Sequence, residues 1–252
     1  MVPRSIRILD VRIDDVDIDE ACVRAAALID AGGIHQFATV NPEFVTTAQR
    51  DAHFLNVLEQ CALALADGVG ITLAARLRGA PLRGRVTGVD LTQRLCTLAA
   101  QRGWGVFLLG AAPGVAEKAA AVLCLHNPGL RIAGCHAGSP RPEHIAEIDA
   151  RIAAAQPQIL FVAYGAPAQD FWLHEFAQRH SAQTNGLLGM GVGGTFDYLA
   201  GVRRYAPRWM RHIGLEWLHR LLSQPSRWRR QISLLHFAAC AIAEAVKILA
   251  HK

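Results

Sequence analysis

The sequence predicts an α/β fold: a mainly parallel sheet with helices on both faces, followed by a basic, helical C-terminal appendage. Short β-rich runs alternate with longer helical patterns along most of the chain. Residues 104–109 are mostly apolar, as expected of a strand that is covered on both faces. After Gly201 the alternation stops, and arginine and tryptophan become frequent. We therefore expect a Rossmann-like core at residues 1–200 and an appendage at residues 201–252.

Helix-capping residues and apolar runs predict the elements of the first half of the core. Residues 6–13 are expected to form a strand, and a helix from about Asp19 ends at the glycine pair 32–33, since glycine commonly terminates helices. After a strand at 35–40, Asn41 and Pro42 begin the next helix, because proline suits the first helical position. The remaining elements of this half are a strand at 61–66, a helix at 70–77, a loop at 79–85 and a helix at 90–101.

The second half continues the alternation. The strand at 104–109 leads through a turn at 110–114 into a helix at 115–125. A strand at 130–134, a helix at 142–155 and a strand at 158–164 follow. Beyond the glycine-dense segment 186–194, only Arg- and Trp-rich helix is expected.

Composition limits the class of protein. Of 252 residues, 52% are hydrophobic and 19% are charged, which is typical of a packed globular chain. The six cysteines show no paired CxxC spacing, so we expect reduced thiols, no metal site and a cytoplasmic protein. The first twelve residues contain no apolar segment of the kind that opens a signal peptide.

The positive charge is concentrated in the tail. Residues 1–200 carry sixteen Lys and Arg against nineteen Asp and Glu, or −3, whereas residues 201–252 carry ten against two, or +8; together they give +5. Residues 231–250 are long enough to cross a bilayer, but His236, Glu244 and Lys247 favour a helix that lies on a surface. The appendage arginines of interest are Arg203, Arg204, Arg208, Arg211, Arg220, Arg227 and Arg230.

Three partners for this tail are considered. Tryptophans 209, 217 and 228 among these arginines, with a leucine stripe at helical spacing, favour the interface of an anionic membrane. A basic segment with aromatic residues also suits single-stranded nucleic acid, and a tail that packs on its own core with solvated arginines would look similar. We favour the membrane and expect no nucleic acid.

Two short motifs invite other interpretations. Residues 189–194 fit the dinucleotide pattern GxGxxG, but no second strand ending in an acid lies about twenty residues further on, so a dehydrogenase is disfavoured. Asp15, Asp17 and Asp19 resemble a metal-binding DxD. Because they precede a helix, we interpret them as a solvated helix start.

Polar, glycine-containing clusters stand at four strand ends, where open α/β sheets bind ligands. Glycine allows close approach of the backbone, and exposed N–H groups can bind phosphate. Asp67, beside a glycine at a strand end, is placed like a general base. Each cluster alone is ordinary turn chemistry; their joint occurrence points to a site. The clusters are residues 39–43, 66–70, 110–114 and 164–170.

The ordered set of segments resembles the WecG/TagA/CpsF family, glycosyltransferase family 26, over nearly the whole chain. The matching segments are TVNPEFV (39–45), ADGVGI (66–71), RVTGVDL (85–91), GVFLLGAAPGVAEKAA (105–120), LFVAYGAPAQDFW (160–172), GVGGTFDYLAGVRRYAP (191–207) and GLEWLHRLLSQPSRWRR (214–230). The resemblance implies an inverting, metal-independent enzyme that uses UDP-sugars to extend polyprenyl-diphosphate-linked sugars for cell-surface polysaccharides, with an appendage that meets the membrane.

Carried over by position, the resemblance makes Asp67 the catalytic base, with Thr39, Asn41 and Gln169 beside it and Arg85 facing donor phosphate or acceptor. The family often has Lys before this Gln and Glu after it, where the present chain has Ala168 and Asp170. Phosphate binding by a lysine at this position is therefore not expected in this chain. Further substrate-binding residues are expected at Gly110, Ala111, Gly114, Gly165, Gly193, Gly194 and Asp197.

These expectations give a peripheral enzyme at the inner face of the bacterial plasma membrane, with no cofactor. It would transfer a hexose or N-acetylhexosamine, and N-acetylmannosamine is favoured. The sequence is compatible with a homo-oligomer and with a monomer. The alternative is a non-catalytic sugar-nucleotide-binding or scaffold protein of a polysaccharide assembly complex. Retention of Asp67, Thr39 and Gln169 together argues against that alternative.

Overall fold

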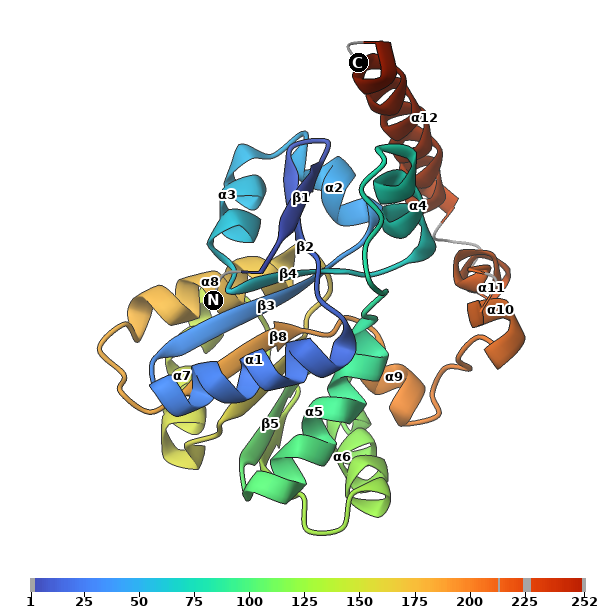
Figure 1. Ribbon diagram of the computed structural model, residues 1–252. Coiled ribbons are helices and arrows are strands. Elements are labelled where there is room, and N and C mark those ends of the chain that lie inside the picture. The colour runs from blue at the N-terminus through green and yellow to red at the C-terminus, as the bar shows by residue number, and fades with distance from the viewer. Residues whose placement is uncertain (1–2, 213, 224–227, 251–252) are drawn as a thin grey trace.

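The computed structural model describes residues 3–212, 214–223 and 228–250 and confirms the α/β fold (Figure 1). Its sheet has eight strands in the order β1-β2-β4-β3-β8-β7-β5-β6, and every pairing except β1 with β2 is parallel. The strands are β1 (Ser5–Ile8), β2 (Val11–Asp14), β3 (Ile34–Val40), β4 (Leu63–Ala66), β5 (Gly105–Gly110), β6 (Arg131–His136), β7 (Ile159–Ala163) and β8 (Leu187–Gly191).

Helices cover both faces of the sheet. Helices α1, α5 and α6 pack on one face; α2, α3, α4 and α12, and beside them α7 and α8, pack on the other. The helices are α1 (Ile18–Ala31), α2 (Pro42–Ala48), α3 (Ala52–Gln60), α4 (Val69–Leu77), α5 (Gly88–Arg102), α6 (Val115–His126), α7 (Pro142–Ala155), α8 (Ala168–Arg179), α9 (Thr195–Leu199), α10 (Arg208–His212), α11 (Glu216–Ser223) and α12 (Trp228–Ala250).

One expected element at the N-terminal side is wrong in detail. Residues 6–13 form the antiparallel hairpin β1–β2 rather than one strand, because Leu9 and Asp10 take positive φ angles and reverse the chain. The expected helix start at Pro42 is confirmed, with Asn41 as the cap of α2. A second helix, α3, follows, because the Asp51 side chain accepts the N–H groups of His53 and Phe54.

The glycine-dense segment 186–194 contains β8, which lies in the middle of the sheet between β3 and β7. Its glycines are required by close packing. A Cβ on Gly189 would come within 2.6 Å of the Leu173 side chain, and one on Gly191 within 2.5 Å of the Gln169 amide. The sequence predicted no strand here because glycine is uncommon in strands.

The acidic run before α1 is only partly a solvated helix start. Asp17 caps α1 by accepting the Glu20 N–H at 2.8 Å, as predicted. Asp15 is instead buried, and its carboxylate accepts the Arg83 N–H at 2.7 Å. The expectation of solvation is therefore wrong for Asp15.

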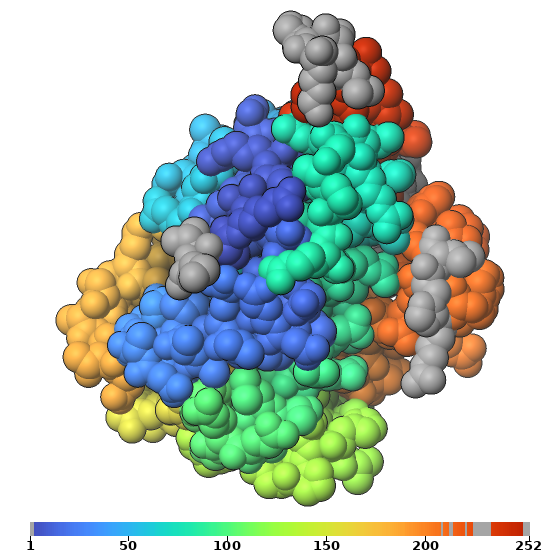
Figure 2. All heavy atoms as spheres, in the orientation of Figure 1, coloured from blue at the N-terminus to red at the C-terminus, as the bar shows by residue number. Residues whose placement is uncertain are grey.

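The last helix returns to the core. Phe237 and Ala241 of α12 are buried in the same apolar cluster as β1–β4, α2 and α4, and Glu244 pairs with Arg78 of the segment that follows α4. Space-filling atoms show α4 at the surface, next to the visible part of the C-terminal helix (Figure 2). Among the described helices, none combines the length and apolarity that a membrane crossing requires. The six cysteines, all described, are free thiols.

Candidate active site

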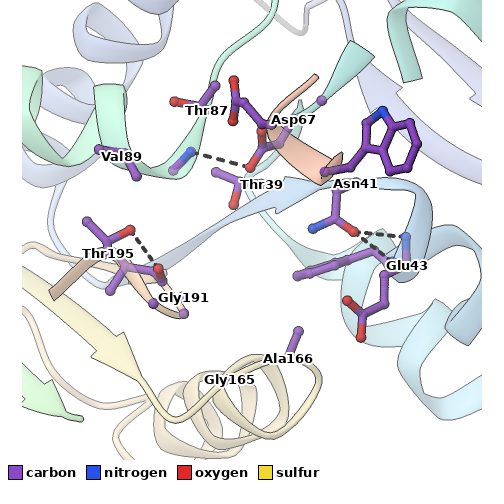
Figure 3. Close-up of a pocket in the computed structure, with 18 of the residues that line it drawn as sticks. Thr39, Asn41, Glu43, Asp67, Thr87, Val89, Gly165, Ala166, Gly191 and Thr195 are labelled. Carbon is purple, nitrogen blue, oxygen red and sulfur yellow. Dashed lines mark hydrogen bonds between the residues drawn. The ribbon is translucent and has the colours of Figure 1, made fainter. Parts of the chain in front are cut away.

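A cavity of about 430 Å³ opens at the carboxyl ends of β3, β4, β7 and β8. Because these strands are parallel neighbours, the residues that follow them meet at one edge of the sheet (Figure 3). The volume suits a small ligand. Of the residues that we expected in the site, ten line it: Thr39, Asn41, Asp67, Arg85, Gly165, Gln169, Gly193, Gly194, Asp197 and Arg203.

Asp67 follows β4 directly, and its position is fixed by two backbone contacts. Its N–H donates to the Val40 carbonyl at 2.8 Å, and its carboxylate Oδ2 accepts the Gly88 N–H at 3.5 Å. Gly88 is the first residue of α5, so the carboxylate lies at a helix N-terminus, where negative charge is favoured. A carboxylate held at the cavity by its own backbone can accept a proton from a bound hydroxyl.

Thr39 and Asn41 come from the adjoining strand end. A Cβ on Gly88 would lie 3.4 Å from Thr39 Oγ1, so Thr39, Gly88 and Asp67 are close neighbours. Asn41 caps α2, with Oδ1 accepting the N–H groups of Glu43 and Phe44 at 2.9 and 3.2 Å. With that oxygen occupied, the amide nitrogen of Asn41 is the group turned away from α2 in Figure 3.

Gln169 joins two loops of the site. Its buried Oε1 accepts the Gly165 N–H at 3.1 Å and the Gly193 N–H at 3.0 Å. These two glycines follow β7 and β8, so one amide oxygen holds both strand ends in register. The geometry makes Gln169 a positioning residue for the glycine loops.

The C-terminal segment forms one wall of the cavity. Arg85 Nη1 lies 3.1 Å from Glu216 Oε1, and Arg85 Nη2 donates to the Arg211 carbonyl at 3.2 Å. Tyr205, which also lines the cavity, lies under the Arg211 guanidinium at 4.7 Å, and its burial raises the pKa of the phenol to about 12. Arg203 pairs with Asp197 at 3.1 Å.

Some expected residues lie elsewhere. The turn with Gly110, Ala111 and Gly114 follows β5, the sheet neighbour of β7, and is not part of the cavity lining. Substrate binding by this turn stays a prediction. Arg204 and Arg211 are outside the lining as well. The side chains of Arg208, Arg220 and Arg230 fall outside the described part of the chain, and so does Arg227.

The sequence alone did not indicate several lining residues. Thr87 caps α5 through Asp90, and the run Thr-Gly-Val-Asp could have shown this as a capping motif. Tyr205, Glu216 and Trp217 carry no such signal, because they reach the cavity only when the C-terminal segment docks. The described residues include no group of three or more His, Cys, Asp or Glu side chains arranged to hold a metal ion.

Comparisons with known proteins bear on this site. The model of the glycosyl transferase WecG/TagA/CpsF family matches residues 6–250. The chain is 34% identical over 204 residues to an N-acetylglucosaminyldiphosphoundecaprenol N-acetyl-beta-D-mannosaminyltransferase of Bacillus spizizenii, covering 81% of this chain and 77% of the relative. It is 32% identical over 207 residues to the Bacillus subtilis protein of the same name, covering 82% and 78%.

Proposed function

Because this chain belongs to the WecG/TagA/CpsF family and is a glycosyltransferase, we propose that it moves an N-acetylhexosamine of the N-acetylmannosamine type from a UDP-sugar to a polyprenyl-diphosphate-linked sugar. The two relatives are named as enzymes that transfer N-acetylmannosamine to an N-acetylglucosamine linked through diphosphate to undecaprenol. The observation that carries the proposal is the Asp67 carboxylate at the cavity, beside Thr39 and the start of α5.

Asp67 acts as the base in this proposal. Inverting transfer needs one carboxylate to take the proton from the acceptor hydroxyl while the anomeric carbon is attacked from the face opposite the leaving group. The UDP leaving group takes the electron pair of the broken glycosidic bond. The new bond is then β when the donor bond is α.

Arg85 and backbone N–H groups would meet the charge of the leaving diphosphate. The Arg85 guanidinium, paired with Glu216, lines the cavity, and so do Thr87, Gly88 and Val89 at the start of α5. Arginine and helix N-termini both stabilise phosphate oxygens. These groups supply positive charge without a metal ion, so metal-independent transfer is part of the proposal.

Peripheral attachment to the inner face of the plasma membrane is supported by the orientation of α11. Glu216 of this helix pairs with Arg85 of the core, whereas Trp217 and Leu222 are exposed. The first residue of α11 thus contacts the core while two of its apolar side chains are open to solvent, as on a helix that meets a lipid surface. Exposed Trp209 and Arg204 lie close to it in the chain.

A donor panel tests the proposal. Purified protein is incubated with UDP-N-acetylmannosamine, UDP-N-acetylglucosamine and UDP-glucose and with an N-acetylglucosamine linked through diphosphate to a short, water-soluble prenyl chain. We expect a disaccharide product, fastest from UDP-N-acetylmannosamine, with a β linkage by NMR. Transfer from none of these donors would contradict the proposal.

A further inference from the structure

Helix α4 carries an apolar stripe on its outer side. Val69, Leu73 and Leu77 recur every four residues and are all exposed, Leu73 by 53% and Leu77 by 43%. The opposite side of the same helix, with Ile71 and Ala74, is buried in the core. A surface helix usually has polar side chains outward, so this stripe needs another explanation.

The stripe begins at the mouth of the cavity. Val69 lines the cavity and is also the first residue of the stripe. Trp217, which is exposed, lines the cavity too, and the turn at Gly214 packs against the Val69 side chain. The mouth is therefore bordered by apolar groups that continue along α4.

Charge beside the stripe has the sign that an anionic lipid surface attracts. Arg76 lies in the last turn of α4 and is exposed, and it appears in none of the ion pairs within the described residues. Apolar side chains flanked by an arginine match the boundary between acyl chains and headgroups.

We propose that α4 is a membrane-contact element of the core: Val69, Leu73 and Leu77 enter the hydrocarbon of the leaflet that holds the acceptor, and Arg76 stays among its headgroups. The cavity mouth then faces the membrane surface, where a diphosphate on a lipid is held. This inference rests on the proposed lipid-linked acceptor. It adds a contact that lies outside the C-terminal appendage.

The test uses the full chain with Leu73→Gln and Leu77→Gln together, since neither side chain lines the cavity. A matched control, Val23→Gln with Leu125→Gln, removes two apolar side chains that are 68% and 79% exposed on α1 and α6 of the other face. Binding to vesicles of phosphatidylcholine and phosphatidylglycerol is measured by co-sedimentation, and folding by thermal melting.

We expect the α4 variant to bind vesicles about tenfold more weakly, because two leucines that would enter the lipid are lost. Its melting temperature should not change, since both side chains are exposed in the free protein. The control should bind as the wild type does. Transfer to a long-chain acceptor in vesicles should fall, while transfer to the short, water-soluble acceptor stays the same. Transfer to the water-soluble acceptor by the wild type tests the proposed function. Vesicle binding tests the membrane contact, and it does not depend on catalytic activity.

Unchanged vesicle binding of the α4 variant would overturn the inference. So would equal losses in the α4 variant and the control. If the variant instead only converts a lipid-free dimer to a monomer in analytical ultracentrifugation, the stripe is an interface between copies of this chain, and the membrane contact is wrong.

Discussion

Arg85 Nη1 and Glu216 Oε1 lie 3.1 Å apart, and about a quarter of each side chain is exposed. The pair joins the segment before α5 to α11, and the same guanidinium also donates to the Arg211 carbonyl. These two contacts orient the Arg85 side chain at the cavity, and they also dock the C-terminal segment on the core.

Glu216→Gln removes the charge of this pair while it preserves the shape of the side chain. We expect faster proteolysis of residues 201–215, by about tenfold, because losing a partly buried ion pair costs about 1–2 kcal/mol of local docking. Limited proteolysis followed by mass spectrometry measures the cleavage rate at each site. Glu143→Gln, which removes an exposed carboxylate 4.0 Å from Arg141, is the control. Equal cleavage of the two variants would show that the pair does not hold the segment.

Gln169→Leu should slow transfer by tenfold or more, roughly the effect of misplacing a loop at a site. The variant leaves the Gly165 and Gly193 N–H groups without their common acceptor, which also costs about 1–3 kcal/mol of stability. Steady-state kinetics and urea unfolding measure the two effects. Gln93→Leu, on the exposed side of α5, should change neither. Wild-type kinetics in Gln169→Leu would remove Gln169 from the site.

The sequence predicted most of the core because apolar runs and caps are local signals. It missed β8, since Gly189 and Gly191 lower strand propensity and are needed only for contacts with Leu173 and Gln169, which are remote in sequence. It merged β1 and β2 because the turn at Leu9 and Asp10 lacks the usual glycine or asparagine.

The site was predictable in part for the same reason. Thr39, Asp67 and Gly165 were found because residues at the ends of parallel strands meet at one edge. The turn at Gly110 follows β5, the neighbour of β7, and does not line the cavity, which local patterns could not show because they do not give strand order. Glu216 was missed because only docking of the C-terminal segment brings it to Arg85.

Asp170 should make stability pH-dependent. Its carboxyl group is buried, and this burial raises its pKa to about 7, against about 3.9 in an unfolded chain. The folded state therefore binds more protons between about pH 4 and pH 7, so the stability of the wild type falls as pH rises through that window and levels off above it. Three pKa units correspond to a contribution on the order of 4 kcal/mol.

Asp170→Asn removes this contribution. The difference in free energy of unfolding between variant and wild type should therefore rise from about pH 4 to pH 7 in favour of the variant. Urea unfolding at a series of pH values measures it, with Asp30→Asn, an exposed carboxylate, as the control. Parallel curves for wild type and Asp170→Asn would mean that Asp170 is ionised at low pH in the folded protein.

Transfer should persist in excess EDTA, because we assign the charge of the leaving diphosphate to Arg85 and backbone N–H groups. The measurement is initial rate with and without chelator, at saturating donor. Loss of activity that Mg²⁺ or Mn²⁺ restores would reject metal independence. Attention would then return to the Asp15, Asp17 and Asp19 run, of which Asp15 is already engaged by the Arg83 N–H.

The turnover of Asp67→Asn tests the central claim most directly. The substitution keeps the size of the side chain and an oxygen that can accept the Gly88 N–H, so the fold and donor binding should be retained. We predict that kcat with the water-soluble acceptor falls about 10²–10⁴-fold, the usual contribution of a positioned general base, while calorimetry shows UDP binding within about twofold of the wild type. Wild-type turnover in this variant would contradict the account, because the proton of the acceptor hydroxyl would then go to another group.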